Sequence, residues 1–392
     1  MDPDEAGWLG AAAVRLHADA QTRGALADTL ANGGLVDFHQ VSRSDEVAIA
    51  ADGSFILALP YLGKVRRWDV RQERTEEKTL DFKSSSLDFK SSSIDRMAMS
   101  ADGRTVVTAD DFDGFTLWDL DERSRPRKLA FLPSVGSFEQ IVLSPDGTTA
   151  LVSYDDIDDD LDVVNVEIWD FRRKSHPALR STLKVPGDYL SDLALSADGK
   201  TAVAVRGDGA GWLVWDLTDP AHPAERQGND RQMESVALSP DGRRAVFGTR
   251  KGAEVWDLGD HARLARVGTM GGEFHDVFAV ALARKGDLAL IADYRGRAVL
   301  WDLTEPSRPV RLAALRTGVG VVEAVALSDD GRTAVMGSPR SGPRVWDLSQ
   351  VDRDPLASFC RQAGDVIAEE YWDQYAEGNG SAYADGDFRL CD

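Results

Sequence analysis

Alternating aspartates in one short stretch have the spacing of oxygen ligands for a calcium ion. The four are Asp156, Asp158, Asp160 and Asp162, and Glu167 follows eleven residues after the first. A calcium loop between two helices requires glycine at its sixth position. Leu161 stands there, and no helix is expected on either side. A solvated acidic loop is therefore the favoured interpretation, and a cation site is the alternative.

Motifs of the commoner catalytic sites are missing from the sequence. It contains no Gly-x-x-x-x-Gly-Lys-Ser/Thr loop for phosphates, no Gly-x-Ser-x-Gly elbow and no His-Glu-x-x-His pair. The six histidines are scattered over unrelated positions, namely His17, His39, His176, His222, His261 and His275. Asp and Glu residues are abundant, but their spacing does not indicate a catalytic group. The sequence therefore predicts neither an enzyme nor a bound cofactor.

Cys360 and Cys391 are the only cysteines, and both lie in the acidic tail that follows residue 350. They allow either one disulfide or two reduced thiols in a packed cap. The reducing cytosol opposes the disulfide. Two thiols do not make a zinc site, and the tail has no histidine.

The balance of charge restricts the class of partner. The formal net charge is −21, whereas nucleic-acid binding depends on Lys and Arg that neutralise phosphates. No stretch approaches 18 consecutive apolar residues, so we expect no membrane span. The chain opens with acidic residues, unlike a secretory signal. The sequence therefore predicts a cytoplasmic protein that binds neither nucleic acid nor membrane.

Seven Trp-Asp pairs, spaced by 41 to 51 residues, reveal the elements that must position any site. Their tryptophans are Trp68, Trp118, Trp169, Trp215, Trp256, Trp301 and Trp346. A tight turn precedes each pair, with glycine at Gly53, Gly103, Gly147, Gly199, Gly242, Gly286 and Gly331. Alternating segments such as "MESVALS" indicate half-buried strands. A repeat of this length with four short strands predicts a propeller blade, and both markers number seven. We expect an all-β, seven-bladed propeller whose tryptophans pack between blades.

The Trp-Asp pairs and Asp-Gly turns resemble the WD40 family over residues 35–348. The chain departs from the family pattern in two ways. The Gly-His pair before the first strand is missing, and Lys251 and Arg295 stand where the family has a turn aspartate. The family's buried hydrogen-bond network therefore cannot form in most blades, and apolar packing should replace it. The connections "TDPAHPAER" and "TEPSRPVRL" resemble those of bacterial, especially actinobacterial, WD40 chains.

The resemblance also predicts how the ring closes and what flanks it. Residues 35–41 should complete the last blade by pairing with the strand that holds Trp346; the alternative is closure by the segment after Trp346. We expect an N-terminal helical cap at residues 1–34, with two helices broken near Asp19. The propeller should span residues 35–350, and an acidic helical tail residues 351–392. The chain resembles the sensor part of larger signalling or defence proteins.

One large side chain occupies the hairpin between the second and third strands of each blade. These are Tyr61, Phe112, Tyr154, Arg206, Arg250, Tyr294 and Arg340, with Arg295 beside them. In WD40 propellers these hairpins surround the channel mouth on the top face. A ring of aromatic and Arg residues has the composition of a protein-binding hot spot, although large residues also shield hairpin ends.

Two functions remain open at this point. The sequence favours a non-catalytic scaffold or sensor that binds a protein or peptide on its top face, with an effector module in the same or another chain. The alternative is a propeller hydrolase or lactonase, or a periplasmic propeller of the TolB kind.

Overall fold

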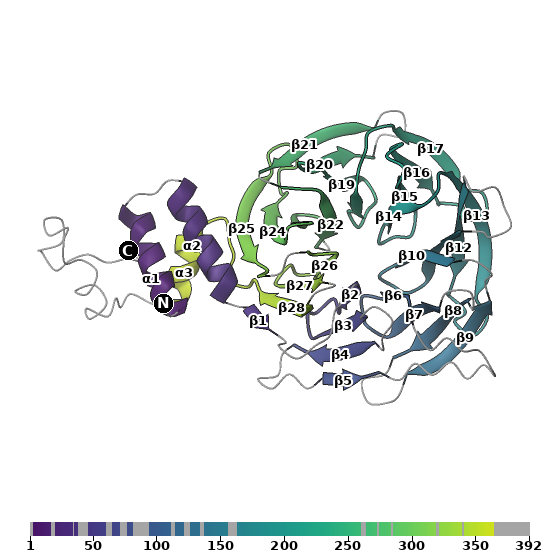
Figure 1. The fold of residues 1–392 in the computed structure, drawn as a ribbon, viewed down its shortest axis with the longest axis horizontal. Helices are drawn as coiled ribbons and strands as arrows, with labels where there is room; N and C mark the ends of the chain where they lie inside the picture. Colours follow the sequence, from purple (N-terminus) through teal and green to yellow (C-terminus); the bar gives the residue numbers. More distant parts are fainter. Residues whose placement is uncertain are drawn as a thin grey trace, which may run out of the picture.

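The computed structural model describes residues 3–16, 20–33, 35–37, 46–59, 65–70, 77–80, 94–110, 114–120, 126–133, 137–155, 163–259, 264–272, 274–283, 285–318, 321–338 and 341–363. These residues form seven four-stranded antiparallel sheets and three helices. The sheets are arranged as the blades of a ring (Figure 1). The predicted all-β, seven-bladed propeller is confirmed.

In blades 1 to 6 the four strands follow one another in the chain, from the innermost strand to the outermost. Blade 1 contains β2 (Glu46–Ile49), β3 (Phe55–Leu59), β4 (Arg66–Asp69) and β5 (Glu77–Thr79). Blade 2 contains β6 (Arg96–Met99), β7 (Thr105–Asp110), β8 (Gly114–Asp119) and β9 (Arg127–Pro133). Blade 3 contains β10 (Ser137–Leu143), β11 (Thr149–Asp155), β12 (Val163–Asp170) and β13 (Ala178–Pro186). Blade 4 contains β14 (Leu190–Leu195), β15 (Thr201–Arg206), β16 (Trp212–Asp216) and β17 (Ala224–Asn229).

The remaining three blades complete the ring. Blade 5 contains β18 (Ser235–Leu238), β19 (Arg244–Thr249), β20 (Gly252–Asp257) and β21 (Ala265–Gly271). Blade 6 contains β22 (Val277–Leu282), β23 (Leu288–Asp293), β24 (Arg297–Asp302) and β25 (Val310–Arg316). Blade 7 contains β26 (Ala324–Leu327), β27 (Thr333–Ser338), β28 (Ser341–Asp347) and, as its outer strand, β1 (Leu35–Asp37).

Blade 7 closes the ring with a strand from the other end of the chain. β1 pairs antiparallel with β28, and Leu35 lies opposite Trp346. The predicted closure is therefore confirmed for residues 35–37, while residues 38–41 lie outside the described part. Because β1 precedes blade 1 in the chain but pairs with a strand of blade 7, the ring cannot open at this point without breaking main-chain hydrogen bonds.

The glycine turns between the first and second strands all have left-handed backbone. Their φ angles lie between +64° and +70°, as in Gly242 and Gly199, a region that glycine adopts at little cost. In five blades a buried serine donates to the turn aspartate; Ser239 Oγ, for example, lies 2.6 Å from Asp241 Oδ1. The same Ser239 Oγ accepts the N–H of Arg244 at 2.9 Å. Sequence and local hydrogen bonding thus specify the same turn in each of these blades.

Each Trp of the seven pairs shares a buried apolar cluster with the preceding blade. The clusters join Trp68 to Val345, Trp118 to Leu57, Trp169 to Phe115, Trp215 to Ile168, Trp256 to Val214, Trp301 to Val255 and Trp346 to Leu300. The indole N–H of Trp118 donates to Thr108 at 2.8 Å. The indole nitrogens of Trp301 and Trp346 have no acceptor among the described residues. The indole N–H groups of Trp169 and Trp256 donate to Glu167 and Glu254 at 2.7 and 3.0 Å, so hydrogen bonds accompany apolar burial in some blades.

Side chains on the innermost strands also link neighbouring blades. Glu46 of blade 1 accepts the N–H of Met97 in blade 2 at 2.6 Å. Asp192 of blade 4 accepts the N–H of Val236 in blade 5 at 2.7 Å. Ser235 of blade 5 donates to the carbonyl of Val277 in blade 6 at 2.9 Å. These hydrogen bonds fix how neighbouring blades are aligned with one another where their innermost strands meet.

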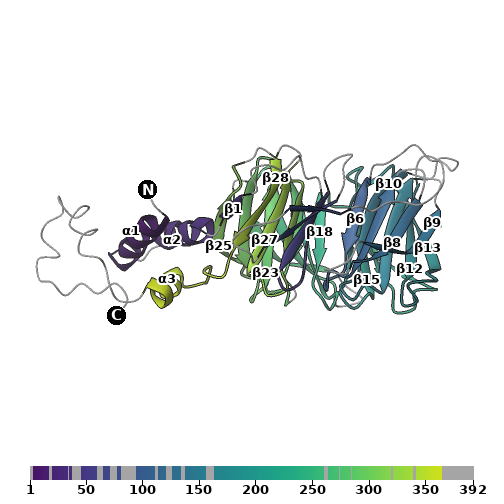
Figure 2. The same ribbon diagram turned by 90° about the horizontal axis from the view of Figure 1, so that it is seen from below.

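The three helices are α1 (Pro3–Leu16), α2 (Ala20–Gly33) and α3 (Pro355–Ala363). They pack around Leu26, Val14 and Phe359 and lie beside the propeller rather than across either face (Figure 2). Two helices at the N-terminus were predicted, and residues 17–19 between them lie outside the described part. Among the described helices, none has the length and apolar character required to cross a lipid bilayer.

Side chains of α2 dock the helices on the outer edge of blade 6. Asp28 accepts the N–H of Ala314 at 2.7 Å, and Asn32 donates to the Ala314 carbonyl at 2.9 Å. Asn32 also accepts the N–H of Arg316 at 2.6 Å. These contacts satisfy backbone groups of β25 that an edge strand leaves unpaired, so α2 covers an edge that could otherwise pair with another chain.

Candidate functional site

Alternation of the strands divides the propeller into two faces. The Asp-Gly turns lie on what we call the bottom face. The hairpins between the second and third strands, and the connections that lead into the next blade, therefore lie on the opposite, top face. The predicted partner-binding residues belong to the top face. Tyr61, Phe112 and Arg340 lie outside the described residues, which leaves five predicted residues to place.

Tyr154 is engaged within its own blade, whereas Arg206 is only half-buried. The Tyr154 hydroxyl lies 3.1 Å from Glu167 Oε1, and its ring packs against Phe138 at a centroid distance of 6.5 Å. Arg206 is half-buried, and its Nε has no hydrogen-bond partner among the described residues. The structure does not bring these two side chains together with the other three.

The remaining predicted residues, Arg250, Tyr294 and Arg295, lie on two hairpins that Asp276 links, since its N–H donates to the Arg250 carbonyl at 3.1 Å and its carbonyl accepts the N–H of Tyr294 at 3.0 Å. Beside them lies Phe278, whose ring centroid is 5.6 Å from that of Tyr294. The two aromatic residues are 45% and 51% exposed. We call Arg250, Phe278, Tyr294 and Arg295 the blade 5–6 surface. An exposed aromatic pair, together with arginines on the two linked hairpins, can receive an apolar side chain and a neighbouring carboxylate.

Phe278 was missed by the sequence analysis, although its position carries a signal. It lies eight residues before the turn glycine of its blade, at a β-bulge between Val277 and Ala279. The equivalent positions of the other described blades are polar: Asp95, Glu139, Ser191, Glu234 and Glu323. A bulge turns the side chain out of the regular alternation, so the aromatic ring reaches the surface instead of the blade interface.

The arginine of blade 5 faces two carboxylates. Arg250 Nε lies 3.7 Å from Glu234 and 3.9 Å from Asp276. Burial raises the pKa of Glu234, the charge of Asp276 raises it further, and Arg250 opposes the shift. Both contacts are long, and the Arg250 side chain is 66% exposed. Its guanidinium therefore remains accessible to a carboxylate of a partner.

The arginine of blade 6 has a different environment. Arg295 is exposed, and its Nη1 lies 3.1 Å from His275 Nε2. It makes no ion pair with any carboxylate among the described residues. Within an acidic chain, this leaves a cation on the top face without an internal counter-charge.

The buried Asp293 positions the backbone beneath this surface. Its Oδ1 accepts the N–H groups of Arg295 and Arg297 at 3.0 and 2.8 Å. Its Oδ2 accepts the N–H of His275 at 3.1 Å. The residue after His275, Asp276, has a φ of +51°, the only positive value of a non-glycine residue in the described part. The hairpin and the preceding connection are therefore held as one unit.

The other predicted sites are only partly described. Asp156, Asp158, Asp160 and Asp162 lie outside the described residues. Over the part that the structure covers, no group of three or more His, Cys, Asp or Glu is placed to hold a metal ion. Cys360 lies in α3 and is disulfide-bonded. Cys391 lies outside the described residues, so the pairing of Cys360 with Cys391 stays a prediction.

Comparison of the chain with models of protein families and with curated proteins finds no match. The assignment to a propeller architecture therefore depends on the seven sheets themselves.

Proposed function

We propose that the chain is a non-catalytic, WD40-like binding module of bacterial type, which holds a segment of a partner protein on the blade 5–6 surface. The observation that carries the proposal is the exposed contact between Phe278 and Tyr294, together with Arg250 and Arg295 on the two linked hairpins. Aromatic and arginine side chains are enriched in binding hot spots because they desolvate a large area and present directed donors.

The proposed ligand is a peptide segment with an apolar side chain next to an aspartate or glutamate. The apolar side chain would cover the rings of Phe278 and Tyr294, and the carboxylate would accept from Arg250 or Arg295. Because the net charge of the chain is −21, the chain as a whole does not attract an acidic peptide, and the attraction must come locally from these arginines.

The proposal extends to the setting of the module. The described helices lie beside the ring rather than over either face (Figure 2), and they offer a connection to an effector module in the same or another chain. The proposed location is the cytoplasm, where the disulfide of Cys360 would be an exception to the usual reduced state of cysteines.

A peptide-display selection against the full chain tests the proposal. Selected peptides should bind the Arg250→Glu, Tyr294→Ala double variant at least about tenfold more weakly, because both an aromatic contact and a cation are removed. Phe131→Ala is a matched control, since Phe131 is an exposed aromatic residue on the outer strand of blade 2. Equal binding of every selected peptide to the wild type and the double variant would exclude this surface.

A propeller hydrolase or lactonase is the competing function. Stoichiometric metal in the purified full chain, together with ester or lactone turnover that is lost on chelation, would favour that alternative. Turnover of this kind would contradict a non-catalytic role regardless of the peptide result.

A further inference from the structure

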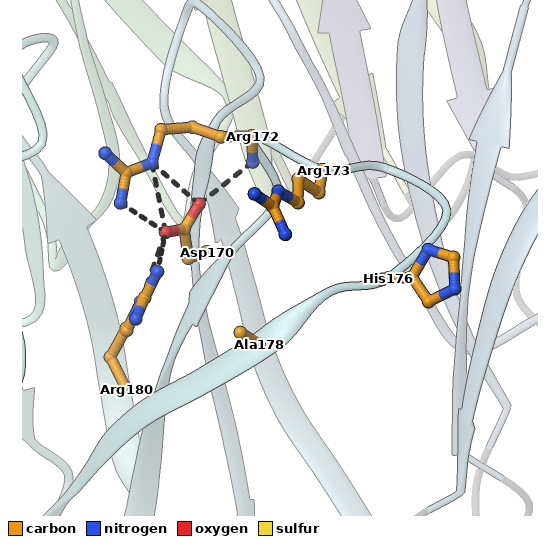
Figure 3. Close-up of a pocket in the computed structure, with 6 residues that line it drawn as sticks. All are labelled: Asp170, Arg172, Arg173, His176, Ala178 and Arg180. Atoms are coloured by element: carbon orange, nitrogen blue, oxygen red, sulfur yellow. Dashed lines mark hydrogen bonds and ion pairs between the residues drawn. The ribbon is translucent and has the colours of Figure 1, made fainter.

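A basic pocket opens on the bottom face of blade 3, away from the blade 5–6 surface. Its volume is about 570 Å³, and it lies where the loop between β12 and β13 returns along the blade (Figure 3). The lining residues are Asp170, Arg172, Arg173, His176, Ala178 and Arg180. Three arginines against one aspartate leave two net positive charges in a chain that is strongly acidic overall.

Asp170 holds two of the arginines in place. Arg172 donates to it from Nε at 3.0 Å and from Nη2 at 2.5 Å, and Arg180 donates from Nε at 3.1 Å. The hydrogen bonds from Arg172, supported by those from Arg180, hold the pKa of Asp170 well below its usual range. The carboxylate therefore stays ionised, and its charge is already compensated within the protein.

Arg173 and His176 are free to contact a ligand. Arg173 is exposed and makes no side-chain hydrogen bond or ion pair with any residue that the structure describes. His176 is also exposed, and only its Nδ1 contacts a neighbour, Ser175 Oγ at 2.9 Å. Figure 3 shows Arg173 beside Asp170, and His176 apart from both at the side of the pocket opposite Arg180. Lys174 is used elsewhere, since its Nζ donates to Thr105 of blade 2 at 2.6 Å.

The same loop in blades 4 and 6 shows what is special about blade 3. After the Trp-Asp pair, blade 3 continues "FRRKSHP", blade 4 "LTDPAHP" and blade 6 "LTEPSRP". The turn is the same in all three, because the residue at the sixth position donates its N–H to the carbonyl at the third. The three bonds are His176 to Arg173 at 2.8 Å, His222 to Asp219 at 3.0 Å and Arg308 to Glu305 at 2.9 Å.

At the third position the charge is reversed between blade 3 and the other two blades. In blade 4, Asp219 sits there and pairs with His222, its Oδ2 3.0 Å from the ring nitrogen. In blade 3, Arg173 replaces the carboxylate, so neither it nor His176 has such an internal partner. The turn does not require arginine, since two other blades form it with an acidic residue. A structural role therefore does not account for Arg173.

We propose that the blade 3 pocket binds a phosphoryl group through Arg173 and His176, with Arg172 and Arg180 supplying further positive charge. A phosphate monoester carries a charge of about −1.5 to −2 at neutral pH and three acceptor oxygens. That charge matches the two net positive charges better than a single carboxylate does. Arginine also suits phosphate because its planar fork donates two parallel bonds. The pocket exceeds the size of a phosphoryl group, which leaves space for the part of the ligand that carries it.

Calorimetric titration of the full chain at low salt tests the pocket, with inorganic phosphate, a phosphoserine peptide and acetate as probes. Arg173→Asp should weaken binding of inorganic phosphate by about tenfold or more, because it replaces a charge-assisted donor with a repulsive charge. The variant should fold normally, since blade 4 forms the same turn with Asp219. Arg308→Ala, at the corresponding loop of blade 6, should leave phosphate binding unchanged.

Equal phosphate affinity of the wild type and Arg173→Asp, or acetate binding as tight as phosphate, would overturn the proposal. A phosphoserine peptide that binds more tightly than inorganic phosphate would identify a modified protein as the source. Similar affinities for both probes would identify a small phosphorylated molecule. Neither result depends on the blade 5–6 surface, because that surface lies on the other face of the ring.

Discussion

The carboxylate of Asp293 accepts the backbone N–H of His275 at 3.1 Å and so joins the end of β23 to the connection that precedes β22. The same side chain accepts the N–H groups of Arg295 and Arg297. One buried residue thereby determines where the top-face hairpin of blade 6 stands relative to the rest of the blade.

Replacing Asp293 should loosen that hairpin. Asp293→Ala leaves three backbone N–H groups without their acceptor, and we expect a loss of about 1–3 kcal/mol of stability. Hydrogen exchange should accelerate at the amides of His275, Arg295 and Arg297. Asp241→Ala, in a bottom-face turn of blade 5, is the control and should leave those amides unchanged. Unaltered exchange in Asp293→Ala would show that the hairpin does not depend on the carboxylate.

Trp256→Ala tests the packing between blades. Trp256 is 5% exposed and shares a cluster with Val214 and Trp212 of blade 4. Loss of a buried indole and the resulting cavity should destabilise the fold by about 3–5 kcal/mol. Tyr294→Ala should change stability far less, because Tyr294 is 51% exposed. Denaturant unfolding measures both variants, and an unchanged free energy of unfolding for Trp256→Ala would contradict its role at the interface.

Asp192 should make the stability of the ring dependent on pH. Burial raises its pKa from 3.8 to about 7, which its hydrogen bonds from Val236 and Leu193 only partly oppose. Since the folded pKa is the higher one, the fold favours the protonated carboxyl. This contribution is fully present below pH 3.8 and is lost as the pH rises through about 7.

The measurement compares the wild type with Asp192→Asn, which cannot ionise. Between pH 4 and 8 the wild type should lose stability relative to the variant by up to about 4 kcal/mol, at about 1.4 kcal/mol per pKa unit. Urea unfolding at several pH values gives the difference. A difference that stays constant with pH would show that Asp192 does not titrate in this range.

Asp28→Ala tests the docking of the helices. Its carboxylate accepts the N–H of Ala314 at 2.7 Å and pairs with Arg311 at 2.8 Å. Without it, exchange of the Ala314 amide should rise about five- to tenfold, since one hydrogen bond contributes about 1 kcal/mol. Thr29→Ala is the matched control, because the Thr29 hydroxyl bonds within α2 to Ala25. If both variants behave alike, the edge of β25 is not protected by Asp28.

The hairpin residues show how far repeat position alone predicts a site. Tyr154, Arg206, Arg250 and Tyr294 all belong to the same hairpin of their blades and were therefore predicted to act alike, although Arg250 and Tyr294 stand one residue further from the turn glycine. The structure separates them, because Tyr154 finds Glu167 on a neighbouring strand while Tyr294 finds only the exposed Phe278. A partner across a strand or a blade decides whether such a side chain is available, and repeat position does not encode that partner.

Phe278 and Arg173 were overlooked for related reasons. Each differs from its equivalents in other blades, so an alignment of the blades within this one sequence would have identified both. Their significance still required coordinates. The bulge at Phe278 and the turn shared by Arg173, Asp219 and Glu305 are properties of the folded backbone.

The sequence by itself determined the blade number and the turns, whereas the strand that closes the ring was predicted only from the WD40 resemblance. These features depend on local rules: a glycine that tolerates positive φ, an alternating apolar pattern and a tryptophan at a regular interval. Only the tertiary structure decided which exposed side chains gather on the top face and which cations lack an internal partner. Those properties arise between residues of different strands and blades, where distance, burial and charge depend on how the sheets pack.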